Sequence, residues 1–133
     1  YLMATIFTRI IKGEIPCYKI YEDENYFAFL DINPLQKGHT LVIPKKEDDY
    51  IFNLDDATYS GLMMTAKKIA AAIKESTNCK RVGVTVLGME VPHVHIHLVP
   101  MNSEKDMLFS NPKMELSKEE FEAIAADIAK RVK

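Results

Sequence analysis

Residues 93–98 alternate strictly between histidine and aliphatic side chains, in the run His93-Val94-His95-Ile96-His97-Leu98. Successive side chains of an extended strand point to opposite faces of a sheet. The imidazoles therefore share one face, and the aliphatic side chains share the other face and belong to the core. We predict a strand over residues 93–99, ended by Pro100, with chemistry on one side and core on the other.

Other segments predict a mixture of short strands and amphipathic helices. Apolar residues recur at helical spacing after Thr5, and Gly13 stands where a helix ends in a left-handed residue. Residues 18–22 and 26–30 read as a β-hairpin, and residues 39–43 and 81–87 as two further strands. A long helix is expected over residues 55–77, and a capping box at residues 117–120 predicts a helix through Ile128.

Composition limits the class of protein. The 133 residues carry a formal charge of −2 and are 47% hydrophobic, so we expect a single domain over residues 1–133 that needs no metal or disulfide to stabilise it. No basic field is available for nucleic acid, and no apolar run is long enough to cross a membrane. Cys17 and Cys79 form no CxxC pair, which favours a reducing, cytoplasmic location. We interpret Met3 as the native start and leave Tyr1 and Leu2 aside.

The three clustered histidines point to chemistry rather than to packing. A lone histidine is usually structural, but neighbouring imidazoles repel one another when charged, so three on one face favour neutral rings or a bound anion. An imidazole can act as nucleophile, acid or base near neutral pH, which suits phosphoryl or nucleotidyl transfer. The alternative is a metal site, since imidazoles at i and i+2 can chelate one ion, although only Glu90 offers a carboxylate nearby in the sequence.

The run from His93 to Pro100 resembles the His-x-His-x-His-x-x signature of the histidine triad (HIT) superfamily, in which x is hydrophobic. The segments at residues 6–16, 29–34 and 38–45 are similar in order and spacing to those of its Hint-like branch. The resemblance covers about residues 4–100. It implies an α+β fold, in which an antiparallel sheet of about five strands carries the long helix on one face and the active site on the other.

The resemblance also implies a function and a set of site residues. It implies a nucleotidyl hydrolase or transferase, similar to nucleoside phosphoramidases, that takes a purine nucleotide or nucleotide conjugate and needs no metal or other cofactor. His95 would be the nucleophile, flanked by His93 and His97 and supported by His39. Asp31 would bind the ribose hydroxyls. The apolar walls around the base would be Ile6, Phe7, Ile10, Phe29 and Ile32.

Each assignment has a structural alternative. The apolar residues of the first helix also fit an ordinary core, and Asp31 also fits a turn residue whose carboxylate binds backbone amides. Residues 45–49 are expected to form a solvated loop. The resemblance further implies a homodimer with the long helix near the two-fold axis, and Leu62, Met63 and Met64 supply more apolar surface than one helix stripe needs.

The loop before the triad departs from the family pattern. In the stretch of residues 84–92 the loop is shorter than in the family, Met89 stands where the family has Gln, and no Asn precedes it. This departure bears on the substrate, above all on dinucleoside polyphosphates. Three alternatives therefore stay open beside phosphoramidase: a nucleotide-binding module with little turnover, a dinucleoside polyphosphate hydrolase, and a metal-binding protein.

Overall fold

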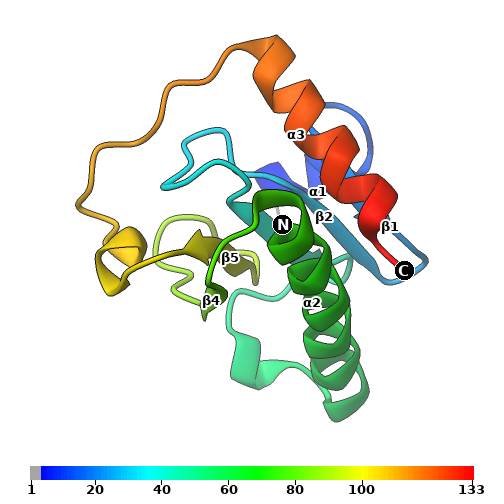
Figure 1. Ribbon diagram of the computed structural model, residues 1–133. Coiled ribbons are helices and arrows are strands. Elements are labelled where there is room, and N and C mark those ends of the chain that lie inside the picture. The colour runs from blue at the N-terminus through cyan, green and yellow to red at the C-terminus, as the bar shows by residue number, and fades with distance from the viewer. Residues whose placement is uncertain (1–3) are drawn as a thin grey trace.

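The computed structural model describes residues 4–133 and contains a five-stranded antiparallel sheet in the order β1-β2-β3-β5-β4 (Figure 1). The interpretation of Met3 as the native start lies outside the described residues. The strands are β1 (Lys19–Glu22), β2 (Tyr26–Leu30), β3 (Thr40–Pro44), β4 (Arg81–Thr85) and β5 (Ile96–Met101). The expected α+β fold with its five-stranded antiparallel sheet is confirmed.

Three α-helices begin at polar residues that cap them. They are α1 (Ile6–Ile11), α2 (Asp56–Thr77) and α3 (Lys118–Arg131), with the 3₁₀ turns η1 (Ile51–Asn53) and η2 (Glu104–Met107) between them. The side chains of Thr5, Asp55 and Ser117 accept hydrogen bonds from the backbone amides of the first turns, which would otherwise lack partners. The predicted caps and the helical periodicity therefore place these helices within a residue or two.

The two faces of the sheet are covered differently. Helices α2 and α3 pack side by side on one face (Figure 1), and their apolar stripes bury the larger core together with Val94, Ile96 and Leu98. A smaller apolar cluster lies on the other face, beneath α1. Its buried members are Phe7, Phe27, Phe29, Leu41 and Ile43. The predicted core side of the histidine run is correct.

Several strand boundaries differ from the prediction. Strand β5 begins at Ile96 instead of residue 93, because the amide of Val94 leaves the ladder and donates to Asp48 O at 2.7 Å. It also passes through Pro100, since pairing with β3 ends at Leu98 and the missing N–H removes no bond on that side. Strand β3 likewise includes Pro44, opposite Tyr26.

Strand β4 ends at Thr85 and not at residue 87. It is one of the two edge strands, so Val84 is half exposed although its alternation with Val82 is as predicted. No helix within residues 4–133 combines the length and hydropathy needed to span a membrane.

Candidate active site

All four histidines lie on the sheet face opposite α2. His39, His93, His95 and His97 are each at most 7% exposed. His39 directly precedes β3, and the pairing of Leu41 with His97 brings β3 and β5 together beside it. Gly38 turns the chain into β3 with φ of +99°, and a Cβ there would lie 3.0 Å from Thr77. The fold thus gathers residues 39 and 93–97 at one place.

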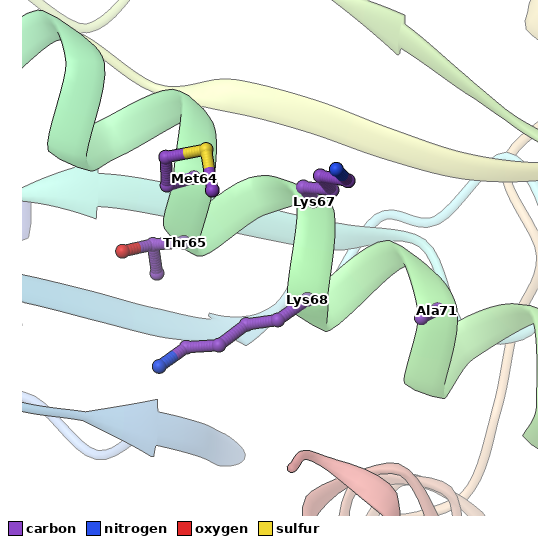
Figure 2. A pocket seen from close by; sticks show the side chains of 5 residues that line it. All are labelled: Met64, Thr65, Lys67, Lys68 and Ala71. Atoms are coloured by element: carbon purple, nitrogen blue, oxygen red, sulfur yellow. The ribbon is translucent and has the colours of Figure 1, made fainter.

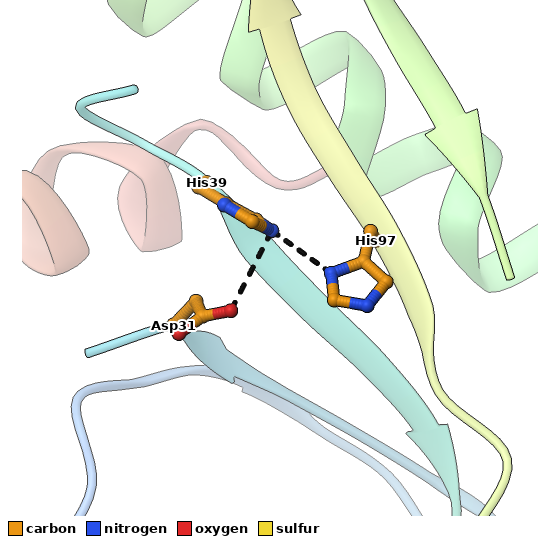
Figure 3. A group of neighbouring side chains, drawn as sticks. All are labelled: Asp31, His39 and His97. Carbon is orange, nitrogen blue, oxygen red and sulfur yellow. Dashed lines mark hydrogen bonds and ion pairs between the residues drawn. The ribbon is translucent and has the colours of Figure 1, made fainter. Parts of the chain in front are cut away.

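The protons on His39 and His97 follow from their partners. The amide of Leu35 donates to His39 Nδ1 at 3.0 Å, so His39 carries its proton on Nε2. That Nε2–H donates to His97 Nδ1 at 3.0 Å (Figure 3). His97 therefore carries its own proton on Nε2. The Leu35 amide thus determines the tautomer of His39, and His39 in turn determines that of His97, which leaves an N–H donor at His97 Nε2.

Both rings of this pair are neutral at neutral pH. The pKa of His39 is lowered from 6.5 to about 3, chiefly by burial and to a smaller extent by the adjacent His97 and by Lys113. Burial also lowers the pKa of His97 to about 4, with a smaller effect from His95. Neutral rings agree with the tautomers assigned from the hydrogen bonds, because a chain of one-way donations needs a free lone pair on each ring.

His93 and His95 are fixed by backbone carbonyls. His93 Nε2 donates to Pro44 O at 2.8 Å, which leaves Nδ1 as an acceptor. His95 Nδ1 donates to His93 O at 2.7 Å, which leaves the lone pair on His95 Nε2. That Nε2 has no protein partner within residues 4–133, although every fully buried side-chain N or O atom in this range is bonded. It therefore reaches solvent, and it is an unprotonated nitrogen free to attack an electrophile.

Asp31 lies at the end of β2 with its carboxylate turned toward His39 (Figure 3). One oxygen, Oδ1, accepts the amide of Asn33 at 2.8 Å, and Oδ2 lies 3.6 Å from His39 Nε2. Burial raises the pKa of Asp31, while the Asn33 amide and the nearby His95 and Lys113 lower it. The turn role expected of this residue is present, and Oδ2 keeps lone pairs for a ligand.

The predicted apolar residues fall into two groups. Phe7 and Phe29 are buried, and the Phe7 ring meets those of Phe29, His93 and His95 edge-on at 5.0–5.7 Å. Ile10 packs, half-buried, against the same cluster. Ile6 and Ile32 are 48% and 64% exposed. The structure thus brings the aromatic residues to the triad and leaves two isoleucines at the surface.

Two contacts to the histidines were not predicted. Phe109, in the segment between η2 and α3, meets the His97 ring edge-on at 4.9 Å and the His39 ring at 6.2 Å. The Lys113 ammonium donates to Phe109 O and Asn111 O, and these bonds hold the segment in a turn. Thr5 and Glu47 form the second contact, since the Thr5 hydroxyl lies 2.7 Å from His93 Nδ1 and Glu47 binds the Thr5 amide. Only the prediction of Thr5 as a cap pointed to any of these residues.

The ligand atoms of Asp31, His39 and His97 all lie within 4.8 Å of one another, as a metal site requires. A metal on His39 Nε2, however, needs the proton on Nδ1, where the Leu35 amide already donates. The donor set therefore suits a proton-ordered hydrogen-bond chain better than an ion. This observation favours the nucleophile interpretation over the metal-binding alternative.

A hollow of about 490 Å³ lies elsewhere, along α2. Met64, Thr65, Lys67, Lys68 and Ala71 line it (Figure 2). Lys68 reaches from it to the Tyr21 hydroxyl at 2.8 Å. None of these five residues is a histidine or a carboxylate, so this hollow offers no chemistry like that of the triad.

A model of the HIT domain family matches residues 12–104. The chain is 36% identical over 133 residues to the adenosine 5'-monophosphoramidase hnt1 of Schizosaccharomyces pombe, covering 98% of this chain and 100% of that protein. It is 32% identical over 114 residues to the adenylylsulfatase HINT3 of Arabidopsis thaliana, covering 82% of this chain and 57% of that protein.

The fold agrees with these sequence matches. A Hit-like protein from Bartonella henselae superimposes with a TM-score of 0.82 at 30% identity, over 98% of each chain. The family model covers β1 to β5 and all four histidines, and it ends before Phe109 and Lys113. By its sequence motif, its family model and its fold, the chain belongs to the HIT domain family.

Proposed function

We propose that this protein is a nucleotidyl hydrolase that releases a purine nucleoside 5'-monophosphate from an amine through a covalent nucleotidyl-His95 intermediate. The observation that carries the proposal is the hydrogen bond from His95 Nδ1 to His93 O, which leaves an unprotonated Nε2 at the surface of the site. The names of the relatives in yeast and plant, a phosphoramidase and an adenylylsulfatase, support a nucleotide substrate.

The reaction has two displacements at the α-phosphorus. In the first, His95 Nε2 forms a bond to phosphorus, the phosphorus–nitrogen bond of the substrate breaks, and the amine leaves with a proton from water. In the second, water attacks phosphorus and gives up a proton, which replaces the one taken by the amine, the bond to Nε2 breaks, and the nucleotide leaves. The Nε2–H of neutral His97 is placed to donate to a phosphoryl oxygen and so to stabilise the charge that develops there.

The same face offers partners for the rest of the nucleotide. Asp31 Oδ2 is a carboxylate acceptor for ribose hydroxyls, and the Phe7 and Phe29 rings form an apolar wall beside the triad. These side chains support binding of a purine nucleoside. We infer a homodimer as well, because Met63 and Met64 leave apolar surface exposed on α2.

A nucleotide-binding module with little turnover is the second candidate. The loop between β4 and β5 favours it, because Leu87 and Met89 are 53% and 90% exposed and offer a phosphate no polar side chain. A dinucleoside polyphosphate hydrolase is less well supported, since the exposed Leu87 and Met89 offer its second nucleotide no polar side chain. The hydrolase and the binding module differ in whether the protein releases nucleotide from a bound conjugate.

The test is incubation with adenosine 5'-phosphoramidate and measurement of released AMP. We expect turnover by the wild-type protein and none by His95→Ala, which should still bind AMP because Asp31 and the Phe7 wall remain. His93→Ala and His97→Ala are the comparison variants, and they should keep residual activity, since loss of an orienting or donating group typically costs about 10² to 10⁴ in rate.

Mass spectrometry of protein quenched without acid during turnover should find the nucleotidyl group on the peptide that contains His95. An adduct on another histidine, or near wild-type turnover by His95→Ala, would refute the assignment of the nucleophile. AMP binding by a wild-type protein that releases no AMP would favour the binding module.

A further inference from the structure

A second polar network joins the start of α1 to the first histidine of the triad. The Thr5 amide and the Thr8 hydroxyl both donate to Glu47 Oε1, at 2.9 and 2.5 Å. The Thr5 hydroxyl lies 2.7 Å from His93 Nδ1. The bond from Thr5 to Glu47 spans 42 positions of the chain, and the bond from Thr5 to His93 spans 88. They tie together α1, the loop after β3 and the segment before β5.

The direction of each hydrogen bond in this network is determined. His93 Nε2 carries the ring proton, because it faces the carbonyl of Pro44. Its Nδ1 is therefore an acceptor, and the single proton of the Thr5 hydroxyl goes to it at 2.7 Å rather than to Thr8 Oγ1 at 3.2 Å. The Thr5 oxygen in turn accepts the Thr8 amide at 3.1 Å as the cap of α1. One hydroxyl group thus caps a helix and fixes the tautomer of a triad histidine.

This bond acts where the sheet no longer holds the chain. Residues 93–95 precede β5, and their backbone is not paired with that of β3 or β4. Their position depends on two backbone bonds, from His93 N to Val91 O and from Val94 N to Asp48 O, and on the two bonds of the His93 ring. His93 O, which accepts the proton of His95 Nδ1, moves with this residue. The orientation of His95 Nε2 therefore depends on the hydrogen bond from the Thr5 hydroxyl to the His93 ring.

We propose that Thr5 and Glu47 are positioning residues: through His93 they hold His95 Nε2 in the orientation for attack. The proposal deepens the proposed function and rests on His95 as its nucleophile. Thr5 acts directly on the His93 ring. Glu47 acts one step away, by anchoring the Thr5 amide and the Thr8 hydroxyl. Neither residue touches the reacting atoms.

The charges around His93 agree with this arrangement. Burial lowers the pKa of His93, while the Pro44 carbonyl and the Glu47 carboxylate oppose that effect and His95 adds to it. The bonds from Thr8 and Thr5 lower the pKa of Glu47. Glu47 and His95 are the titratable groups that act on the His93 ring, and the Phe7 ring packs against it edge-on. Glu47 is thus a carboxylate at neutral pH, able to accept both bonds.

The test compares Thr5→Val, which removes the hydroxyl at almost constant shape, with Thr5→Ser, which keeps it. The matched control is Thr65→Val on α2, whose hydroxyl is also largely buried and binds only Gly61 O of its own helix. We expect kcat for adenosine 5'-phosphoramidate to fall about tenfold in Thr5→Val, as for loss of one hydrogen bond of ordinary strength. Thr5→Ser should stay within about twofold of the wild type, as should Thr65→Val.

Two further readouts separate positioning from a general loss of structure. The Kd for AMP should change by less than about threefold in Thr5→Val, because Asp31 and the Phe7 wall are untouched. Nitrogen-15 NMR of the histidine rings should show His93 protonated on Nε2 in the wild type and in Thr5→Ser, and a mixture of tautomers in Thr5→Val. The NMR result needs no turnover, so it supports the positioning role even where the wild-type protein proves inactive and the proposed function fails.

An unchanged kcat and an unchanged His93 tautomer in Thr5→Val would overturn the proposal, as would a Thr5→Ser variant as slow as Thr5→Val. Glu47→Ala and Glu47→Gln repeat the comparison should Thr5→Val fail to fold. Glu47→Gln keeps an acceptor oxygen for the Thr5 amide and should retain most of kcat. Glu47→Ala has no such acceptor, and its kcat should fall. Equal activity of these two variants with the wild type would exclude a role for Glu47.

Discussion

Acid should destabilise this protein through the two histidines that share a proton chain. His39 and His97 have folded-state pKa values of about 3 and about 4 because burial disfavours the charged ring, against 6.5 when unfolded. Between pH 6.5 and pH 4 the unfolded chain binds protons at both rings and the folded chain does not. The contribution of these two rings to the free energy of unfolding therefore falls as pH falls through this window, and it is constant above the window.

The expected loss is large enough to measure. At pH 5.0, about 1.5 pH units below the unfolded pKa, each of the two histidines costs about 2 kcal/mol of stability. Together they cost about 4 kcal/mol relative to pH 7.5, a large share of the stability of an ordinary domain. His93, whose pKa is also lowered, adds to the same loss. The pKa of carboxylates such as Glu22 and Glu47 is lowered from the ordinary 4.5, so their effect on stability changes mainly below pH 5.0.

Urea unfolding at pH 7.5, 6.5, 5.5 and 5.0 measures this loss. His39→Gln is the informative variant, because its side-chain amide can still donate to His97 Nδ1 but does not titrate. At pH 7.5 it should be less stable by about 1–3 kcal/mol, since the buried Leu35 amide loses its acceptor. Between pH 7.5 and 5.0 it should lose about half as much as the wild type.

A wild-type protein that loses less than about 1 kcal/mol between pH 7.5 and 5.0 would refute the assignment of neutral, buried rings. An equally steep loss in His39→Gln would show that other groups cause the pH dependence. The first result would also contradict the neutral state that the assigned tautomer of His97 requires.

Three further predictions concern the ligand, the assembly and the segment after η2. Asp31→Ala should weaken ribonucleotide binding by about 1.5 to 3 kcal/mol, and deoxyribonucleotide binding by less, when both are measured by titration calorimetry; equal losses would leave Asp31 a turn residue only. Light scattering at micromolar concentration should give about twice the chain mass of 15.2 kDa, and a monomer would refute the homodimer. Phe109→Ala should expose the His97 ring and raise its pKa toward 6.5, as followed by NMR titration; an unchanged pKa would show that Phe109 does not bury the ring.

The alternation of residues 93–98 predicted which side of the chain meets the core, because the two-residue period is a property of any extended backbone. It did not predict where β5 begins. That boundary depends on Asp48 O, which competes for the Val94 amide from a loop nearly fifty positions earlier. Contacts of this kind are made by the fold, and no local pattern reports them.

The same reasoning explains which site residues were found. Helical spacing and the family motif pointed to Phe7, and the cap rule pointed to Thr5, but only in its local role. Glu47 was expected in a solvated loop, and its side chain is largely exposed, yet it accepts one bond from the Thr5 cap and one from Thr8 of α1. Phe109 carries no motif. Such residues become visible only when distant segments are placed side by side.

Backbone groups, and not the histidine run alone, determine which nitrogen of each histidine ring carries the proton. A regular continuation of β5 back to residue 93, between β3 and β4, would engage its carbonyl in the ladder. The chain instead leaves the ladder before Ile96, so His93 O is free to accept His95 Nδ1–H. Pro44 O and the Leu35 amide similarly fix His93 and His39. The same run of histidines within a fully paired strand would keep its alternation and lose the directed lone pair on His95 Nε2.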